Sequence, residues 1–425
     1  MTIAAIADDF TGATDVAVAF RRAGLGVGIV FGVPDDSTPA GGYDAIVIAL
    51  KSRTIPAADA VGQSLGSLAW AQRRGYERCY FKYCSTFDSS PRGNIGPVSD
   101  ALADRLGAAL TIVTPASPVH GRTVYRGHLF VGDQLLSESP MRHHPLTPMT
   151  DSNLVTVLGT QTERPIGLLR HETVRQGSEA IARELAALRD AGIRYAVADA
   201  LSDDELAAIG RAAAGDALVT GAAGLAGGLA AALAAGSARG DALRETDLGP
   251  YDRPAVIAGS CSARTLEQVA RMARSRPSHR LDVLHDPRPE RLCERALAWY
   301  DGLDPASGAP IIHSSLPPEE LRAVQDALGV EAAAQIVESA LGSIASGLVA
   351  RGVDRLVVAG GETSGSVTSA LGIRTGAIGS EAAPGVPWIL VEAPHRLALL
   401  LKSGNFGTEE LLAAASARAG EERDG

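Results

Sequence analysis

The chain has 425 residues, which is more than one hydrophobic core usually serves. Its composition, with 46% hydrophobic and 21% charged residues, is typical of a globular protein. A formal net charge of -10 excludes a nucleic-acid backbone as the main partner, and 4% aromatic residues exclude a platform for stacking bases. Four scattered cysteines, no signal peptide and no apolar run of about 20 residues predict a cytoplasmic protein without a membrane partner.

The first half of the chain alternates short apolar runs with amphipathic segments. We expect strands at 2–7, 27–31, 45–50, 78–83, 109–114, 166–170, 194–199 and 217–220. We expect helices at about 12–23, 57–74, 94–106, 172–191, 202–213 and 222–235. This alternation predicts βαβ units and a largely parallel sheet. The polar stretch 120–153, with three prolines, breaks the rhythm and predicts long functional loops.

Residues 236–253 are polar and charged and predict a linker between domains at 1–240 and 250–425. After it the pattern predicts strands at 254–259, 281–285, 310–313 and 356–361. Helices follow at roughly 263–274, 318–327, 331–351, 364–371 and 407–418. The predicted fold class is therefore α/β, with two domains, each a largely parallel sheet flanked by helices.

Two acids, Asp8 and Asp9, stand at the end of the first predicted strand, where ligands bind in open α/β sheets. Either could be a general base, or could accept hydrogen bonds from substrate hydroxyls. The alternative is that one is a helix N-cap and the other a solvated turn residue. Asp15 falls one turn into the following helix and could simply complement its dipole.

A second polar cluster begins as a strand at Lys82 and then places hydroxyls, an acid, a cation and an amide in one loop. Its candidate site residues are Lys82, Ser85, Thr86, Asp88, Arg92 and Asn94. Such a loop suits a small polyhydroxy acid, because Arg92 can hold a carboxylate bidentately while the other side chains hold hydroxyls. The alternative is a turn stabilised by its own side chains, with Arg92 on the surface and Asn94 capping the next helix.

The long polar loop adds His120, Arg122, Arg142, His143, His144 and Asp151. Two adjacent histidines do not have the spacing of a metal site on a helix, so surface or supporting roles are favoured and metal ligands stay unassigned. Contact of Arg142 or His144 with an anionic substrate is the alternative.

Three glycine turns stand out in the second half, at 258–262 (AGSCS), 359–365 (AGGETSG) and 402–407 (KSGNFG). The first two follow predicted strands and open helices, so their N–H groups can converge on an anion while glycine admits a phosphate closely. Each could be an ordinary turn, but three in one domain favour a nucleotide pocket. Neither a Walker A pattern nor G-x-G-x-x-G occurs. The residues alone thus predict an α/β protein that binds a polar anion.

Together these clusters resemble the four-carbon acid sugar kinase family, and most closely its 3-oxo-tetronate kinase branch. The segments that carry the likeness span almost the whole chain: 6–13 (IADDFTGA), 81–89 (FKYCSTFDS), 93–96 (GNIG), 121–125 (GRTVY), 141–145 (MRHHP), 148–151 (PMTD), 360–365 (GGETSG) and 401–407 (LKSGNFG). The resemblance implies an N-terminal domain that binds the acid sugar and a C-terminal domain that binds ATP.

The resemblance also implies an activity, which is ATP-dependent phosphorylation of the terminal hydroxyl of a 3-oxo-tetronate to the 4-phosphate. The residues that match the ATP site are Ser260, Ser262, Gly360, Gly361, Glu362, Thr363, Ser364 and Gly404. The sister branch of threonate and erythronate kinases carries Lys-x-Asp-Ser-Thr-Leu-Arg-Gly-Asn in the second cluster. Here residues 82–88 read KYCSTFD, which favours the oxo-acid branch and leaves the stereochemistry at carbon 2 open.

In the mechanism that we expect, the glycine turns hold the triphosphate with Mg²⁺ bridging its oxygens, and Arg92 with Lys82 holds the substrate carboxylate. Asp8 or Asp88 orients or deprotonates the hydroxyl, and Lys402 either touches the phosphates or is a surface lysine. The alternatives are a threonate or erythronate kinase, a sugar-acid lyase or dehydrogenase, and a sugar-acid sensor. A homodimer is the commonest assembly of soluble proteins.

Overall fold

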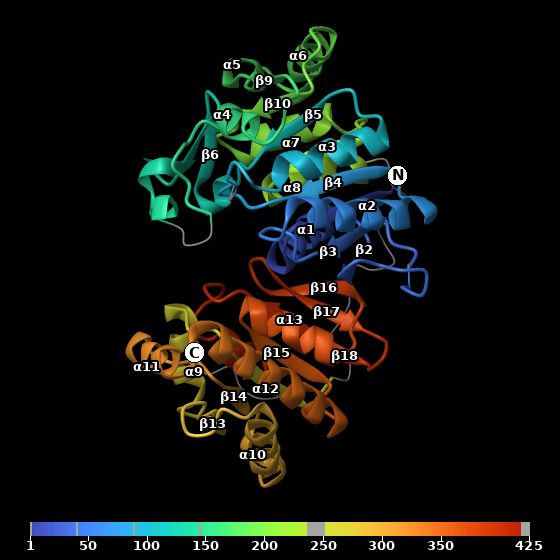
Figure 1. Ribbon diagram of the computed structural model, residues 1–425. Helices are drawn as coiled ribbons and strands as arrows, with labels where there is room; N and C mark the ends of the chain where they lie inside the picture. The colour runs from blue at the N-terminus through green and yellow to red at the C-terminus, as the bar shows by residue number, and fades with distance from the viewer. Residues whose placement is uncertain (1, 40, 88–89, 144–146, 236–250, 418–425) are drawn as a thin grey trace. The chain divides into compact units, whose positions relative to one another are not determined.

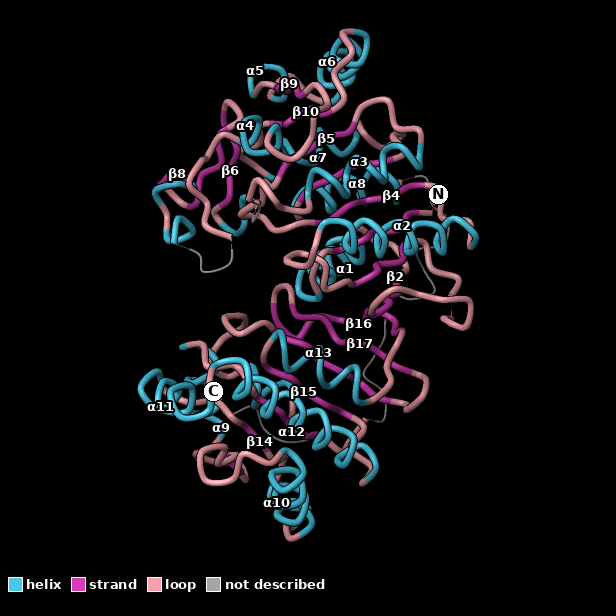
Figure 2. The backbone as a smooth tube through the Cα atoms, viewed as in Figure 1, coloured by secondary structure: helices cyan, strands magenta, loops and turns pink. Residues whose placement is uncertain are grey.

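The computed structural model describes residues 2–39, 41–87, 90–143, 147–235 and 251–417, and the chain forms two compact units, Met1–Arg244 and Glu245–Gly425. Each unit is a sheet with helices on both faces, which confirms the predicted α/β class (Figures 1 and 2). Most of the predicted linker 236–253 lies outside the described residues, as do Asp88 and His144.

The sheet of the first unit has the order β2-β3-β1-β4-β11-β5-β10-β9, and all neighbouring strands are parallel. Its strands are β1 (Ile3–Ala7), β2 (Val27–Phe31), β3 (Ala45–Ala49), β4 (Arg78–Lys82), β5 (Thr111–Thr114), β9 (Ile166–Leu169), β10 (Tyr195–Ala198) and β11 (Leu218–Gly221). Each matches a predicted strand. The central strands are buried on both faces, which explains their continuous apolar sequences.

The helices of the first unit cover both faces of this sheet: α1 packs on α8, α8 on α7, and α2 on α3. They are α1 (Phe10–Arg22), α2 (Ala57–Arg73), α3 (Ile95–Leu106), α4 (Leu154–Gly159), α5 (His171–Val174), α6 (Ser178–Asp190), α7 (Asp203–Ala212) and α8 (Ala223–Ala234). The prediction of a single helix at 172–191 was wrong. The segment forms two helices, because Gly177, with φ +92°, separates α5 from α6.

The stretch 120–153, predicted as long loops, contains a small antiparallel sheet, β6-β7-β8. Its elements are β6 (Arg122–Tyr125), β7 (His128–Val131) and β8 (Gln134–Leu135), with 3₁₀ turns at Pro118–His120, Leu136–Glu138 and Pro140–His143. Arg126 and Gly127, both with positive φ, form a two-residue hairpin between β6 and β7. The strands are too short and too polar for their alternation to be recognised in the sequence.

The sheet of the second unit has the order β13-β14-β12-β15-β18-β17-β16, parallel from β13 to β18 and antiparallel beyond. Its strands are β12 (Pro254–Ala258), β13 (Ser278–Arg280), β14 (Ile311–His313), β15 (Arg355–Ala359), β16 (Thr375–Ala383), β17 (Val386–Val391) and β18 (Leu397–Lys402). The strand predicted at 281–285 was wrong, since β13 ends at Arg280. Strands β16 to β18 were missed, because no helix separates them and the βα rhythm gives no signal there.

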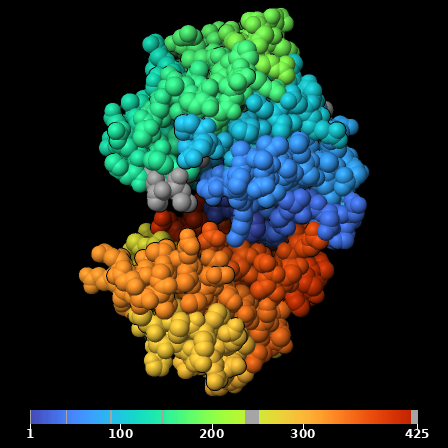
Figure 3. All heavy atoms as spheres, viewed as in Figure 1, coloured from blue at the N-terminus to red at the C-terminus, as the bar shows by residue number. Residues whose placement is uncertain are grey.

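The helices of the second unit are α9 (Ala263–Met272), α10 (Pro289–Asp301), α11 (Pro318–Leu328), α12 (Val330–Ala350), α13 (Gly361–Ala370) and α14 (Leu411–Ala415), with a 3₁₀ turn at Pro305–Ser307. Helix α10 was missed, and the helix predicted at 407–418 is the much shorter α14. Helix α12 packs on α10, α11 and α13, and α9 packs on α14. Residues of α11 and α12, coloured orange, cover much of the visible face of this unit in Figure 3.

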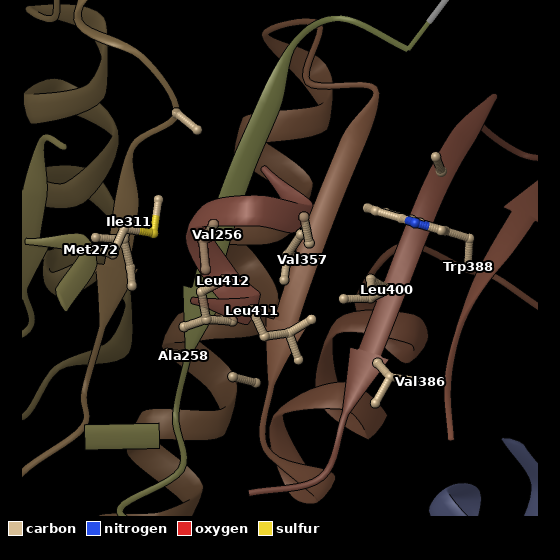
Figure 4. Packing of buried hydrophobic residues seen from close by; sticks show 14 of the residues in the cluster. Val256, Ala258, Met272, Ile311, Val357, Val386, Trp388, Leu400, Leu411 and Leu412 are labelled. Carbon is tan, nitrogen blue, oxygen red and sulfur yellow. The ribbon is translucent and has the colours of Figure 1, made fainter. Parts of the chain in front are cut away.

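The core of the second unit lies on the face of the sheet that α9 and α14 cover. Leu411 and Leu412 pack over Val256, Ala258 and Val357, as Figure 4 shows. The short helix α14 therefore closes this core although it contributes only one turn.

Of the helices that the structure describes, α12 is long and apolar enough to cross a membrane by length and composition. We had predicted no such stretch. A core helix of a globular domain meets the same two criteria, and Leu341, Ile344 and Leu348 of α12 are fully buried in this unit. We therefore interpret α12 as a core helix of this unit.

Candidate active site

The polar residues of the first unit gather where β1, β3 and β4 end. These strands are adjacent, with Ala7 opposite both Ala49 and Lys82, so Asp8 lies between the loops that follow β3 and β4. Its backbone N–H donates to Lys82 O (3.1 Å), and its carbonyl accepts from Ser52 N (2.9 Å). The carboxyl edge of three parallel strands thus holds Asp8 in place.

Asp8 is 6% exposed and its carboxylate binds Arg53 through two hydrogen bonds. Arg53 Nε donates to Oδ2 (2.9 Å) and Nη2 donates to Oδ1 (2.7 Å). Burial raises the pKa of Asp8, and the Arg53 guanidinium opposes that rise. Burial alone would lower the pKa of Arg53, but the two neighbouring carboxylates raise it above its usual value. Arg53 is therefore a permanent cation beside a carboxylate with increased basicity.

Asp9 is the N-cap of α1, because its Oδ1 accepts from Gly12 N (2.9 Å). The same carboxylate oxygen lies 2.8 Å from Arg53 Nη2. The capping alternative is thus confirmed for Asp9. The solvated-turn alternative is wrong for Asp8, which is buried and paired.

Lys82 is 4% exposed and its Nζ donates to Tyr83 O (2.7 Å), its one acceptor among the described residues. An ammonium has three N–H groups, so two remain for a ligand. A Cβ at Gly12 would lie 2.7 Å from Lys82 Nζ, so glycine allows this ammonium to approach the start of α1. A buried cation beside a helix N-terminus is suited to binding a carboxylate.

Asn94 holds the loop that carries Arg53. Its Nδ2 donates to Ser52 O (2.6 Å), Arg53 O (3.2 Å) and Ile55 O (2.9 Å). Asn94 occupies the N-cap position of α3 but makes no side-chain capping bond, so that alternative was wrong. Its buried Oδ1 has no partner in the described part of the chain. Asn94 therefore positions Arg53.

The remaining residues of the second cluster lie around the loop after β4. Ser85 is half-buried, and Thr86 is buried with its Oγ1 2.8 Å from Cys84 Sγ. Arg92 is exposed, and its guanidinium bonds to none of the described residues. The structure thus brings Asp8, Asp9, Lys82 and the missed Arg53 together, whereas Arg92 stays at the surface. Of the long-loop residues, Arg142 bonds to Ser137 O and His120 Nδ1 to Ser117 Oγ.

Asp15 is a second residue whose environment the sequence did not reveal. It is half-buried on α1 and forms no hydrogen bond or ion pair with the described residues. Burial raises its pKa to about 6, and Lys82 opposes the rise. Such a carboxyl group changes charge near the pH at which kinases and other enzymes work.

In the second unit the three glycine turns meet at one edge of the sheet. Strands β12, β15 and β18 are adjacent and parallel, so all three carboxyl ends lie together. Gly259 N donates to Ala359 O (3.0 Å) and Gly360 N donates to Lys402 O (2.9 Å). The third turn follows strand β18, which the sequence analysis had not placed.

Helix α13 begins at Gly361 without a side-chain cap. Gly360 has φ +129°, a conformation that favours glycine, and accepts from Ser364 Oγ (2.7 Å). A Cβ at Gly361 would meet no atom within 4 Å, so the helix start faces open space. Uncapped N–H groups at an open helix start form a site suited to phosphate.

The turn around Gly404 completes this edge. A Cβ at Gly404 would lie 2.6 Å from Ser260 Oγ and 2.9 Å from Ser262 Oγ, so only glycine fits beside the serines. Ser262 caps α9 through Thr265 N (3.3 Å), and Ser260 Oγ donates to Ser262 Oγ (3.2 Å). The predicted ATP residues of the three turns therefore adjoin one another in the fold.

Lys402 is 1% exposed and points into the unit instead of toward the turns' open side. Its Nζ donates to Thr265 Oγ1 (3.0 Å), Gln268 Oε1 (2.5 Å) and Gly404 O (2.9 Å). Burial, with Arg264 nearby, lowers its pKa to about 8. The surface alternative is therefore wrong, because Lys402 is buried and ties the Gly404 turn to α9, and contact with the phosphates stays a prediction.

No group of three or more His, Cys, Asp or Glu side chains with metal-site geometry occurs among the residues that the structure describes. Magnesium in kinases is held mainly by phosphate oxygens and waters, with one or two carboxylates. The second glycine turn itself contains a carboxylate, Glu362, an exposed residue in the first turn of α13.

Two domain families match this chain, the sugar-binding N-terminal domain at residues 3–229 and the nucleotide-binding C-terminal domain at residues 255–412. These matches define a class of two-domain proteins with a sugar-binding domain followed by a nucleotide-binding domain. The chain belongs to the four-carbon acid sugar kinase family, in the branch of its 3-oxo-tetronate kinase relatives. The family that the motifs predicted is thereby confirmed.

Proteins named 3-oxo-tetronate kinase are similar over nearly the full length. Those of Cupriavidus necator and Burkholderia multivorans are 48% and 49% identical, with 95% of this chain aligned to 93% and 94% of theirs. A solved chain from Salmonella typhimurium, provisionally described as a tRNA synthase, has TM-score 0.89 at 41% identity, covering 97% of this chain and 98% of that one. A Haemophilus influenzae chain has TM-score 0.82 at 41% identity, with the same coverage of both chains.

Proposed function

We propose that this protein is an ATP-dependent kinase that phosphorylates the terminal hydroxyl of 3-oxo-tetronate to give 3-oxo-tetronate 4-phosphate. The observation that carries the proposal is similarity along nearly the whole chain to proteins named 3-oxo-tetronate kinase, at 48% and 49% identity. The glycine turns and the Lys82 environment support the two halves of that reaction. The names of these relatives do not favour a threonate kinase, a lyase, a dehydrogenase or a sensor.

We assign ATP binding to residues 250–425. Gly360 precedes α13, and the first turn of the helix, up to Ser364, exposes Gly361 and Glu362 to solvent. Ser260, Ser262 and Gly404 adjoin this turn. When bound, ATP supplies the phosphoryl group, with Mg²⁺ neutralising its oxygens. The uncapped N–H groups of α13 would hold the phosphates, and Glu362, in the first turn of the same helix, would be available for the cation.

We assign acid-sugar binding to residues 1–240. Lys82, with two free N–H donors, would hold the substrate carboxylate, and the exposed Arg92 could add a second contact. Ser85 and Thr86 lie on the adjoining loop and would bind the substrate's oxygens. Asp8 accepts one bond at each oxygen from Arg53 and has further lone pairs for the reacting hydroxyl.

Asp8 is the better candidate for orienting or deprotonating that hydroxyl, because burial increases its basicity. Asp88, the second candidate, lies outside the described residues and stays a prediction. The homodimer and the cytoplasmic location likewise stay predictions.

The test is ADP release with Mg-ATP and a panel of D- and L-threonate, D- and L-erythronate and their 3-oxo forms. We expect release with one 3-oxo acid, and the Asp8→Asn variant should lower turnover far more than ATP affinity. Release with threonate or erythronate alone would move the protein to the sister activity. Absence of release with every acid, from folded protein that binds ATP, would overturn the substrate assignment.

A further inference from the structure

Three polar side-chain atoms in one turn of the second unit are buried and form hydrogen bonds with none of the residues that the structure describes. They are Nδ1 of His313, Oγ of Ser314 and Oγ of Ser315, in residues that are 8%, 5% and 4% exposed. Buried polar groups are nearly always paired, because an unpaired one destabilises the fold. Three in succession indicate that a partner from outside the chain completes this turn.

The turn lies beside the candidate nucleotide site. It follows β14, the neighbour of β12 at the same carboxyl edge, with Ala258 opposite His313. Ser314 N donates to Ala258 O (2.9 Å), and Leu316 N donates to Cys261 Sγ (3.4 Å). The Ser314–Leu316 segment thus packs directly against the turn that carries Ser260 and Ser262.

The chemistry of this turn suits a neutral polar group better than a phosphate. Burial, with Arg280 nearby, lowers the pKa of His313 to about 4, so its imidazole is uncharged at neutral pH. Arg280 is paired with Glu320 (2.9 Å), and Glu319 and Glu320 make the first turn of the following α11 acidic. An acidic helix start disfavours a phosphate. The sequence of residues 314–318, SSLPP, provides no aromatic ring on which a base could stack.

We propose that Ser314 and Ser315, with the imidazole of His313 beside them, bind the ribose hydroxyls of the nucleotide. This inference rests on the proposed function, because it takes ATP as the ligand of the glycine turns. A hydroxyl both donates and accepts, so two serines match the ribose diol. Each serine can also turn its hydroxyl toward a ligand by a change of χ1 rotamer, without moving the backbone.

The order of the strands agrees with this assignment. The helix that would hold the phosphates, α13, follows β15, and the serine turn follows β14. Because the sheet has the order β14-β12-β15, the serine turn lies two strands, or roughly 10 Å, from the start of α13 along the edge of the sheet. A nucleotide laid along the edge would place its phosphates at α13 and its ribose at the β14 turn.

The experiment measures binding by calorimetry, without an acceptor acid, for Mg-ATP, Mg-2′-deoxy-ATP, Mg-3′-deoxy-ATP and Mg-tripolyphosphate. We expect wild-type protein to prefer ATP over at least one deoxy analogue by about 3- to 10-fold, the range of one hydrogen bond. The Ser314→Ala/Ser315→Ala double variant should bind ATP and that analogue equally, with unchanged affinity for tripolyphosphate.

Thermal unfolding of the free protein separates this role from a purely structural one. Removing unpaired hydroxyls should leave the Tm of the double variant unchanged or raised. The matched control is Ser416→Ala, a buried serine of the same unit whose Oγ donates to Leu412 O (2.7 Å). It should lower the Tm and keep the wild-type preference for ATP.

Two results would overturn the inference: equal wild-type affinity for ATP and both deoxy analogues, or a double variant that keeps the preference, whether its Tm is unchanged or lowered. A lowered Tm with the preference kept would assign the hydroxyls to a buried water. If the wild-type protein binds tripolyphosphate but no adenine nucleotide, or binds neither, the proposed function itself fails.

Discussion

Arg53 binds Asp8 through two parallel hydrogen bonds of 2.9 and 2.7 Å, although the two residues stand 45 positions apart in the chain. The pair forms because β3 lies next to β1, so the loop after β3 passes over the end of β1. The Arg53 side chain is 22% exposed and that of Asp8 is 7% exposed. This partly buried pair is the centre of the candidate substrate site.

Replacing Arg53 by Met should lower the free energy of unfolding by roughly 2–4 kcal/mol, because it leaves the Asp8 carboxylate buried without its cation. Activity should fall at least 100-fold, since the pKa of Asp8 would rise further and its orientation would be lost. Urea unfolding and steady-state kinetics measure both effects. The control is Arg73→Met, which removes an exposed pair with Asp36 and should cost less than about 0.5 kcal/mol. An Arg53→Met variant with wild-type kinetics would remove the pair from the site.

Asp15 should make stability depend on pH between about 4 and 6. Burial raises its pKa to about 6 in the folded protein, above the 3.8 of an exposed Asp, so the folded state binds this proton more tightly. The resulting stabilisation is complete at low pH and is lost as the pH rises through about 6. The amide side chain of the Asp15→Asn variant cannot ionise. The variant should therefore be more stable than wild type at pH 8, by roughly 1–2 kcal/mol for this half-buried group. At pH 4 this advantage should be smaller, because the wild-type carboxyl group is then protonated in the folded protein. A stability difference that is the same at both pH values would contradict the raised pKa.

Lys402→Met should destabilise the second unit by roughly 2–4 kcal/mol, because Gln268 Oε1 loses its donor and Thr265 Oγ1 and Gly404 O each lose one of theirs. The Gly404 turn should move, and ATP affinity should fall as a consequence, because Lys402 holds this turn through Gly404 O. Lys402→Arg should not restore it, since the longer guanidinium does not fit the same three acceptors. Calorimetric ATP affinity and thermal unfolding test this prediction. Unchanged unfolding with lost ATP binding would instead indicate direct contact with phosphate.

Alanine at two glycines of the nucleotide site should lower ATP affinity in both cases but have different effects on stability. Gly404→Ala places a Cβ 2.6 Å from Ser260 Oγ and should lower both stability and ATP affinity. Gly361→Ala meets no protein atom within 4 Å, so stability should be unchanged or raised by roughly 0.5–1 kcal/mol. Its methyl group projects into the space that we assign to phosphate, so ATP affinity should fall about 10-fold or more. Wild-type ATP affinity in Gly361→Ala would place the phosphates elsewhere.

Asn94→Ala tests whether the Arg53 loop must be held in place. The variant removes three hydrogen bonds to the carbonyls of Ser52, Arg53 and Ile55. We expect a loss of roughly 1–3 kcal/mol in stability and a fall in kcat with little change in ATP affinity. Asn94→Asp should not rescue activity, because a carboxylate cannot donate to carbonyl oxygens. A variant that loses affinity for the acid sugar but keeps kcat would favour direct substrate contact by Asn94.

Much of the parallel sheet could be predicted from the sequence. Strands β1 (IAAIA) and β3 (AIVIA) are apolar throughout, because strands buried on both faces require it, and acids or glycines follow several of the strands in the turns. Strands β17 and β18 were missed although their sequences, VPWILV and LALLLK, are equally apolar. The strand predictions depended on apolar runs that alternate with amphipathic helices, and no helix lies between β17 and β18.

The candidate site could be predicted only in part. Asp8, Asp9, Lys82 and the glycine turns were recognised because they directly follow apolar strands. Arg53 was overlooked, since nothing in its neighbourhood distinguishes it from a surface arginine, and its partner lies on another strand. Asn94 was read as a helix cap, which is its local role by position, whereas its side chain binds a loop about 40 residues earlier.

The sequence by itself determined the α/β class, the family and the positions of the polar turns, because apolar periodicity and turn chemistry are local properties of the chain. Tertiary structure alone decided that Arg53 pairs with Asp8, that Lys402 points inward, and that Ser314 and Ser315 adjoin the Ser260 turn. The physical reason is that a side chain's partner depends on which strands are neighbours in the sheet, and the order of parallel strands is set by packing of the whole unit.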